Sequence, residues 1–271
     1  PDKPTIFMGS RSVFNFTMRL DSHAGGHHSG NWGGLLTNPG VVMAHALASM
    51  IDRNGKILVE GWRSNQIPNS VRAAIAKLDV GEGENTPDIN PNWGEPDLTV
   101  AERVFASNTF EVRAFETGNP KSPANAIPPS AVVFGHLRYV VGTDISKLMP
   151  LLRAHLDKHG FNDITITSER DMMPATRLDP DHPWAKWAIG SLSKTADDEI
   201  AVVPNLGGSL PNDVFADLLG LPTIWVPHSY AGCSQHAPNE HILESISKSA
   251  LRLMTGLWWD LGAGNTPRQV S

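Results

Sequence analysis

Three glycine-bearing loops carry residue types that could bind a metal ion, an oxyanion or a carboxylate. "HHSGNWGG" contains His28, "NLGGSLPND" contains Gly207, Gly208 and Ser209, and "AGCSQHAPNEH" contains His236. A loop imidazole where a strand passes into a helix can act as a metal ligand or base, and the N–H groups of a glycine pair can bind an anion. For the first loop the alternative is a glycine-rich turn with solvated histidines. For the second it is a tight turn, and for the third a capping or surface histidine. Residue types alone leave both sets of interpretations open.

A hydrolytic metal site needs about three protein ligands per zinc ion and a nearby general base. The chain has no His-Glu-x-x-His motif and no Glu-Glu pair. The one His-x-Asp pair, His155 and Asp157, lies on an amphipathic helix, and we expect it to be at the surface. The acidic residues at 197–199 are typical of a solvated turn. Cys233 is the single cysteine, which excludes a cysteine-built zinc cage and an internal disulfide. Residue types and spacing therefore give one candidate ligand and no base.

The composition is that of a globular protein, with 40% hydrophobic and 18% charged residues and a net charge of −6 over 271 residues. No Lys/Arg block stands out, which argues against a nucleic-acid partner, and no apolar run approaches the roughly 20 residues of a membrane helix. The single cysteine fits a reducing compartment, so we expect a cytoplasmic location. The opening "PDKPTIFMGSRSVFNF" has neither an initiator methionine nor a targeting pattern, so we expect that Pro1 is not the natural start of the gene product.

The elements that position these loops fall into two groups, with a boundary predicted near residue 170. The first group follows the order strand, helix, strand, strand, helix, strand, which predicts a ferredoxin-like α+β sandwich. Its elements are the strands 13–20, 110–118, 130–142 and 163–168, a helix opened by Asn38-Pro39, and a helix capped by Asp144. Residues from about 56 to 108 are interpreted as an insertion with short helices at 71–78 and 99–107.

The second group alternates helices with apolar strands, which indicates a parallel sheet covered on both faces. We expect helices at 184–196, 211–219 and 239–259, and buried strands in "EIAVVPNL" and "PTIWVPHS". Two strands are few for an independent doubly wound domain. This group therefore looks like half of one.

The three loops also resemble, in order and spacing, those of the dinuclear zinc aminoacylase/carboxypeptidase family, which includes carnosinase-type dipeptidases, glutamate carboxypeptidase and succinyl-diaminopimelate desuccinylase. "HHSGNWGGLLTNP" looks like the family's His-Ser-Gly-x-x-Gly-Gly…Asn-Pro loop, and "ANAIPPSAVVFGHLRYVVGTD" like its Asn-x-Ile-Pro…Arg strand. "GGSLP" followed by "HAPNEH" is similar to the Gly-Gly-Ser-Ile-Pro and His-x-x-Asn-Glu segments of its dipeptidase branch. The resemblance implies a ferredoxin-like lid and the C-terminal part of a parallel α/β zinc-peptidase catalytic domain.

The resemblance also implies roles and boundaries. His236 would be a terminal ligand of a centre of two divalent metal ions, expected to be Zn²⁺. His28 would reach the partner subunit's active site and stabilise the oxyanion of the tetrahedral intermediate. Residues 1–12 would end one catalytic-domain segment, 13–170 would form the lid and dimerisation domain, and 171–271 would complete the catalytic domain.

Substrate contacts are implied in the same way. Arg138 and Asn125 would contact the carboxylate and carbonyl end of a dipeptide-like or N-acyl amino acid substrate, because the planar guanidinium of arginine matches a carboxylate. The Gly207–Ser209 segment would hold substrate from the other side. His136 shares a strand face with Arg138 and could support it, although a histidine satisfied within its strand is the alternative.

The family's remaining metal ligands and its Glu-Glu base lie upstream of the lid, in a segment that this sequence does not contain. We therefore expect the chain alone to bind zinc weakly and to hydrolyse nothing at a useful rate. Two hypotheses stay open: a metal-dependent amide hydrolase that is a homodimer through the lid, and a non-catalytic dimerisation or binding module derived from that family.

Overall fold

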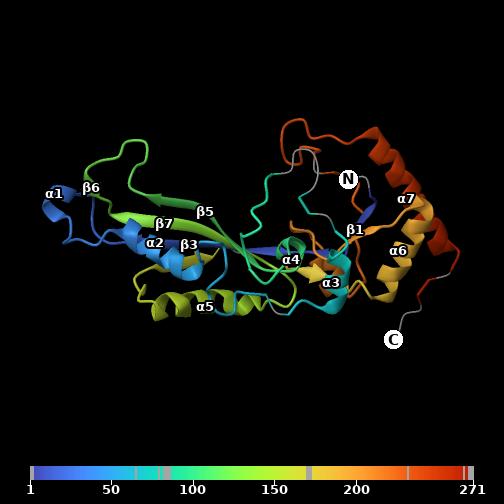
Figure 1. The fold of residues 1–271 in the computed structure, drawn as a ribbon, viewed down its shortest axis with the longest axis horizontal. Coiled ribbons are helices and arrows are strands. Elements are labelled where there is room, and N and C mark those ends of the chain that lie inside the picture. Colours follow the sequence, from blue (N-terminus) through green and yellow to red (C-terminus); the bar gives the residue numbers. More distant parts are fainter. Residues whose placement is uncertain are drawn as a thin grey trace.

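The computed structural model describes residues 3–64, 66–78, 80–81, 87–168, 173–230, 232–264 and 266–267. Two groups of elements lie toward opposite ends of an elongated molecule (Figure 1). We call residues 12–168 the lid unit, and residues 3–10 together with 173–264 the second unit. The boundary predicted near residue 170 lies outside the described residues and stays a prediction.

The lid unit is built on four antiparallel strands. They are β3 (Ser12–Asp21), β5 (Thr109–Thr117), β7 (Ser130–Tyr139) and β8 (Thr165–Ser168), in the order β5-β7-β3-β8. Helices α2 (Pro39–Met50) and α5 (Ile145–Lys158) lie along one face of this sheet (Figure 1). The first and third strands in chain order occupy the centre, which is the ferredoxin-like arrangement. The fold class predicted for this part of the sequence is confirmed.

An aromatic core fixes the covered face of the sheet to the helices. Alternate residues of β3 are buried there, and the ring of Phe16 lies 5.4 Å from that of Trp62 and 5.8 Å from that of Phe110. Met43 of α2 and Leu148 of α5 belong to the same fully buried cluster. Each such side chain contributes roughly 1.5–3 kcal/mol when it leaves water. The opposite face of the sheet stays half-exposed, so it is free to carry polar groups.

Both lid helices begin where their capping residues predict. The Asn38 side chain accepts a hydrogen bond from the N–H of Gly40 at 3.1 Å, and Pro39 occupies the first helical position. The Asp144 side chain accepts from the N–H of Ser146, also at 3.1 Å. These bonds satisfy N–H groups that have no partner within the helix, and so they fix the first residue of each helix.

The segment predicted to be an insertion lies against the second unit. Its short helices α3 (Asn69–Ile75) and α4 (Val100–Phe105) enclose a small apolar cluster of their own. The guanidinium of Arg103 donates to backbone carbonyls of the loop before α4, those of Pro91, Trp93 and Glu95. Asn205 of the second unit donates to the carbonyl of Phe105 at 2.6 Å. The segment therefore links the lid sheet to the second unit.

The second unit combines chain segments from both sides of the lid unit. Strand β1 (Thr5–Phe7) pairs in parallel with β10 (Ala201–Val203), and β2 (Gly9–Ser10) pairs with β9 (Thr176–Arg177). The helical elements are α6 (Pro183–Ala196), the π-helix η1 (Val214–Leu218) and α7 (Glu244–Gly262). Its core joins Ile6 and Met8 to α6 and α7. None of the described helices combines the length and apolar character needed to cross a bilayer.

Two elements expected in the second unit differ in the structure. The predicted strand "PTIWVPHS" forms only one bridge, between Trp225 and Phe7, because Pro222 and Pro227 have no N–H to donate to a ladder. The closing helix begins at Glu244 rather than at residue 239, since Asn239 has a left-handed φ of 65°.

In the lid unit, the surface position expected for His155 is wrong. Its side chain is buried, and its Nε2 forms a hydrogen bond with Oγ of Ser49 at 3.1 Å.

Gly135 of β7 lies so close to the aromatic core that a side chain at this position would collide with it. A Cβ there would lie 2.5 Å from Cζ of Phe16, against the aromatic core. We expect Gly135→Ala to lower the free energy of unfolding by about 1–3 kcal/mol, as overpacking does. Urea unfolding followed by circular dichroism measures the change.

Gly190 is the matched control for this prediction, because it lies inside α6 and a Cβ added to it would meet no atom within 4 Å. Gly190→Ala should raise the free energy of unfolding by about 0.5–1 kcal/mol through helix propensity. Equal effects at the two glycines would contradict the packing described for Phe16.

Candidate active site

The outer end of the lid unit holds His28 and Asn125 next to each other. Strand β4 (His27–His28) pairs with β6 (Ala126–Ile127), and the N–H of Ser29 donates to the carbonyl of Asn125 at 2.9 Å. Nδ1 of His28 accepts from the N–H of Gly30 at 3.1 Å and thereby caps helix α1 (Ser29–Trp32). In the neutral ring Nε2 then carries the proton, and the exposed side chain offers a donor to groups outside the lid.

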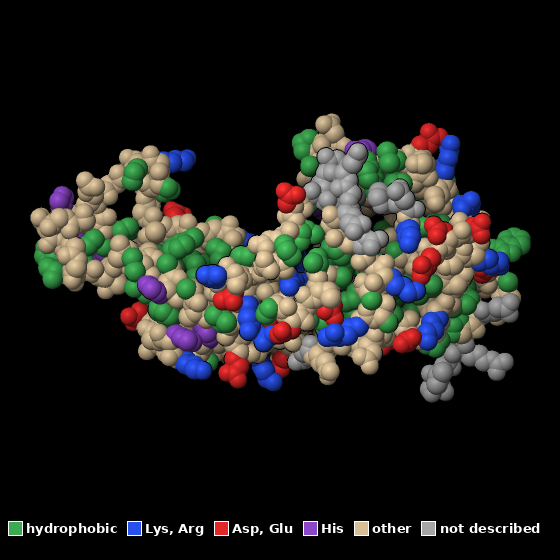
Figure 2. Space-filling model, in the orientation of Figure 1, with side chains coloured by type: hydrophobic (Ala, Val, Ile, Leu, Met, Phe, Trp, Pro, Cys, Tyr) green, Lys and Arg blue, Asp and Glu red, His purple; other side chains and the backbone are tan. Residues whose placement is uncertain are grey.

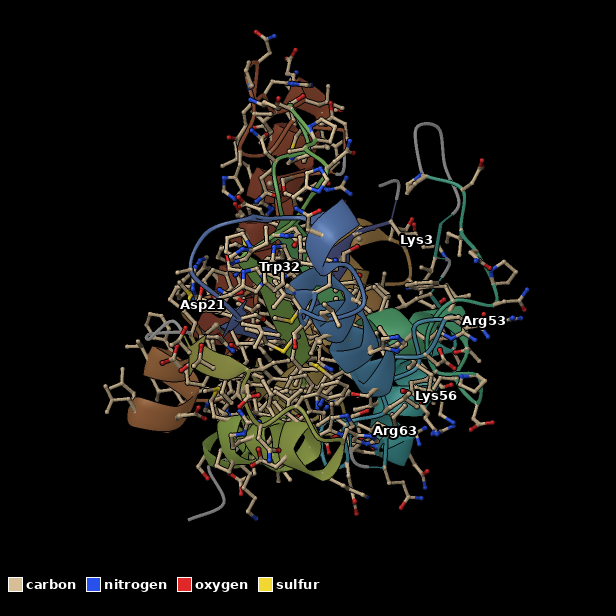
Figure 3. All side chains as sticks on the ribbon, turned by 90° about the vertical axis from the view of Figure 1, so that its left-hand side faces the viewer. Lys3, Asp21, Trp32, Arg53, Lys56 and Arg63 are labelled. Atoms are coloured by element: carbon tan, nitrogen blue, oxygen red, sulfur yellow. The ribbon has the colours of Figure 1, made fainter. Side chains whose placement is uncertain are left out.

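Neighbouring histidines at this end are held by other rings. His23 and His27 lie with their ring centroids 5.0 Å apart, and His27 also lies 6.2 Å from Trp32. In a view along the long axis, Trp32 lies at the end that faces the reader (Figure 3). Nδ1 of His23 also forms a hydrogen bond with the carbonyl of Gly25 at 2.9 Å, so what distinguishes His28 among the three histidines is that its ring caps a helix.

Arg138 lies at the other end of the lid sheet, on its open face. It pairs with Val13 of β3, and His136 two residues earlier pairs with Glu111 of β5. Both Arg138 and His136 are half-buried. The face is hollowed between the loop that joins β5 to β6 and the second unit (Figure 2). Arg138 and His136 thus lie on the sheet face that the two helices leave uncovered.

Arg11 connects this face to the Gly207–Ser209 segment. Its backbone N–H donates to the carbonyl of Leu206 at 2.9 Å, and its side chain is only 7% exposed. Nη2 of Arg11 lies 3.5 Å from the position that a Cβ of Gly207 would take. Sequence reasoning did not single out Arg11. The available signal was strand parity, since residues 11, 13 and 15 point to the same face as Arg138.

The charges around Arg11 influence one another. The pKa of Arg11 is lowered to about 10, chiefly by burial and also by the positive charge of Arg138, while Glu111 opposes the shift. Partial burial raises the pKa of Glu111, against the attraction of Arg11. Burial lowers the pKa of His136, and Arg138, Arg113 and Arg11 add to the effect. His136 is therefore uncharged at neutral pH and adds no positive charge to this face.

His236 lies in a loop of unusual backbone conformation. Ser234, His236 and Asn239 all have left-handed φ values between 57° and 65°. The N–H of His236 donates to Oε2 of Glu240 at 3.3 Å, and its ring is exposed rather than packed inside or capping α7. Such conformations in non-glycine residues cluster at functional sites. The exposed ring is thus available to a ligand.

The structure does not bring a complete metal site together. Among the described residues, no group of three or more His, Cys, Asp and Glu side chains could hold a metal ion. The residues present therefore do not fit a metal centre by themselves, with His236 as the single candidate ligand from the sequence. No catalytic step through a metal follows from these side chains.

The candidate substrate contacts separate into two groups. His28 and Asn125 lie at the beginning of β7, whereas Arg138 and Gly207 lie at its far end. The eight residue steps from Ser130 to Arg138 span about 27 Å at roughly 3.4 Å per residue. Within one copy of the chain, His28 therefore cannot reach the surroundings of Arg138 without a large rearrangement.

A family comparison agrees with this architecture. Residues 11–164, more than half of the 271, match the model of the M20 peptidase dimerisation domain. The chain belongs to the M20 peptidase family. The peptidase family indicated by the resemblance is thereby confirmed. The matched residues include β3, β5 and β7 together with both helices that cover the sheet.

Individual relatives are dipeptidases and carboxypeptidases. The chain is 22% identical to human "Beta-Ala-His dipeptidase" and 23% identical to the "Cys-Gly metallodipeptidase DUG1" of Saccharomyces cerevisiae, over 89% of its own length in both cases. It spans 49% and 52% of these relatives, about half of each. The solved M20 family metallo-carboxypeptidase Sso-CP2 from Sulfolobus solfataricus superposes with a TM-score of 0.77 at 25% identity, covering 94% of this chain and 59% of that one.

Zinc binding tests the incompleteness of the metal site. Full sets of zinc ligands give apparent binding free energies of about 10–16 kcal/mol. With one candidate ligand, the 271-residue chain should bind Zn²⁺ several orders of magnitude more weakly, without stoichiometric saturation at micromolar concentration. Isothermal titration calorimetry of metal-stripped protein measures this. Tight uptake of two ions per chain would refute the prediction.

Proposed function

We propose that this chain supplies the lid and the substrate-binding side of a metal-dependent hydrolase of amide bonds in dipeptide-like or N-acyl amino acid substrates. The observation that carries the proposal is the junction at Arg11, whose charge interacts with that of Arg138 of the lid sheet and whose Nη2 lies next to Gly207 of the second unit. Membership in the M20 peptidase family supports the reaction class.

The two groups of contacts suit a site shared between two copies. In this proposal His28 and Asn125 of one copy act on substrate held by Arg138 and the Gly207–Ser209 segment of the other. The Nε2–H of His28 can donate to the oxyanion that forms when the amide carbonyl is attacked, and such a donor stabilises the transition state more than the substrate. The distance between the two ends of β7 supports this division, because it prevents both groups from serving one site in a single copy.

The proposed cofactor is a pair of divalent metal ions, Zn²⁺ by family resemblance, with His236 as one terminal ligand. When bound, such a centre supplies an activated water molecule at neutral pH. The residues of this chain would bind and orient the substrate, and His28 would stabilise the developing negative charge.

Dipeptides are the substrate class that the relatives' names favour. The human relative is named for β-alanyl-histidine, and the yeast relative for cysteinyl-glycine. Both carry a free carboxylate, the group that a guanidinium binds with two parallel hydrogen bonds.

A second candidate function is a non-catalytic dimerisation or binding module. The observation that favours it is the lack, among the described residues, of a group of three metal ligands. Metal-dependent hydrolysis by the full-length gene product distinguishes the two candidates, since a module would bind small carboxylates without consuming them.

The first experiment measures hydrolysis of β-alanyl-histidine, cysteinyl-glycine and N-acetyl amino acids by the full-length gene product loaded with Zn²⁺. We expect turnover that chelation abolishes. His28→Ala should lower kcat by about two to three orders of magnitude, as the loss of an oxyanion donor does, with a much smaller change in KM.

His45 provides the matched control, because it is an exposed histidine of α2 on the same lid unit. His45→Ala should leave kcat close to that of the wild type. An unchanged kcat in the His28 variant would reject the role proposed for His28. No hydrolysis of any amide by the loaded protein would reject the hydrolase.

A second experiment tests the homodimer through the lid unit. Strand β5 is the longer edge of the sheet, and Val112 and Phe115 on it are 42% and 41% exposed. Exposed edge strands with apolar residues pair readily with another strand. Light scattering at micromolar concentration should give twice the mass of one chain, and Val112→Lys with Phe115→Lys should shift the protein toward the monomer.

Ile145→Lys is the control, since Ile145 is similarly exposed on α5 and away from the β5 edge. It should leave the dimer intact. A wild-type protein that is strictly monomeric, or a dimer that both sets of changes weaken equally, would contradict pairing through β5.

A further inference from the structure

Two histidines lie close together beside a cavity at helix α5. His155 lies in the last turn of α5, His159 caps its C-terminal end, and their ring centroids are 4.4 Å apart. Both residues line an open cavity of about 470 Å³. Figure 2 shows histidine side chains gathered on the surface over α5. The residues of the candidate active site are not among those that line this cavity, so the histidine pair needs an explanation of its own.

The hydrogen bonds of His155 determine which of its two nitrogens is free. The residue is only 8% exposed, and its Nε2 lies 3.1 Å from Oγ of Ser49 on α2. The Ser49 hydroxyl donates its one proton to the carbonyl of Ala46 at 2.7 Å, so it accepts from His155, and Nε2 of His155 carries the ring proton. Nδ1 then holds a lone pair for which the described residues provide no donor. A buried histidine at a cavity thus keeps one unused acceptor.

The surroundings of His155 keep its ring uncharged. Burial lowers the pKa of His155, His159 and Lys158 add to the effect, and the hydrogen bond to Ser49 opposes it. A histidine binds a metal ion through the neutral ring, because protonation removes the lone pair. At neutral pH His155 is therefore already in the state that a metal ion requires.

The other charged residues that line the cavity balance one another. Lys147 and Lys158 are positive, Glu60 and Asp144 are negative, and Lys147 pairs with Asp144 at 3.0 Å. A cation therefore meets no excess of positive charge in this cavity, and an anion gains no attraction from it.

The spacing of the two rings matches that of two ligands of one ion. Because imidazole nitrogens bind metal ions at about 2.0–2.1 Å, two rings that bind one ion at right angles have centroids about 4.5 Å apart. The centroids of His155 and His159 are 4.4 Å apart. Ligands at right angles are typical of the square-planar or tetragonal geometry of Cu²⁺ and Ni²⁺, and Cu²⁺ binds such ligands most tightly.

We propose that His155 and His159 bind one Cu²⁺ or Ni²⁺ ion in this cavity, with Nδ1 of His155 and one ring nitrogen of His159 as the ligands and water in the remaining positions. Ser49 orients His155 by accepting from its Nε2–H, as hydrogen-bond acceptors commonly do for metal-binding histidines. The site holds two protein ligands, which agrees with the lack, among the described residues, of a group of three. The proposal does not depend on the proposed function.

The test is Cu²⁺ binding by the 271-residue chain, measured by isothermal titration calorimetry and electron paramagnetic resonance. The first equivalent should bind at micromolar concentration and give a spectrum with two imidazole nitrogens. Zn²⁺ should bind the same pair more weakly, because it lies below Cu²⁺ in affinity for nitrogen ligands. His159→Ala removes one ligand from an exposed position, so the variant should fold, lose about tenfold or more in affinity and show one nitrogen.

Ser49→Ala tests the hydrogen bond that orients His155. It leaves both ligands in place but removes the acceptor of the Nε2–H, so the affinity for Cu²⁺ should fall by about 10- to 100-fold. Should this variant fail to fold, the comparison of His159→Ala with the wild type still decides the proposal.

His27→Ala is the matched control, because His23 and His27 form a second close pair of rings, 5.0 Å apart, in the lid loop. It should keep the first equivalent of Cu²⁺ and the two-nitrogen spectrum. Three results would overturn the proposal: no binding of Cu²⁺ by the wild type at micromolar concentration, wild-type affinity in a folded His159→Ala or Ser49→Ala variant, or loss of the first equivalent in His27→Ala.

Discussion

One-sided burial of the lid sheet is the constraint on which the rest of the structure depends. Phe16, Trp62 and Phe110 pack their rings on the face that α2 and α5 cover, and Gly135 leaves room for them. Since side chains of a strand alternate between faces, every residue committed to this core leaves its neighbour on the other side. The open face can therefore hold Arg138 and other charged groups in register without disturbing the core.

The same sheet also works as a spacer. Its long central strands, β3 and β7, keep the His28 loop at one end and the Arg11 junction at the other. A rigid separation of this kind favours chemistry shared between two molecules over chemistry within one. The segment of about residues 56–108, whose loop is held by three hydrogen bonds from Arg103, contacts the second unit and so fixes it relative to the same sheet.

Local patterns in the sequence were enough to predict the lid, and long-range contacts account for what was missed. Alternation in β3 and the caps at Asn38 and Asp144 depend on residues close in sequence, and each prediction was confirmed. Arg11 was missed because its importance comes from Gly207, which is distant in the sequence, and from burial that composition does not reveal. The strand predicted around Trp225 failed because two prolines limited its ladder to one bridge.

The left-handed residues around His236 have a consequence for the energetics of ligand capture. Each costs about 1 kcal/mol relative to a relaxed backbone, yet the loop is closed by hydrogen bonds from His241 to the Cys233 carbonyl and from Ala237 to the Ser234 carbonyl. The entropy cost of ordering this loop therefore arises when the chain folds and not when a ligand binds. A group that reaches the imidazole finds the backbone that carries it already ordered, and keeps more of its intrinsic affinity.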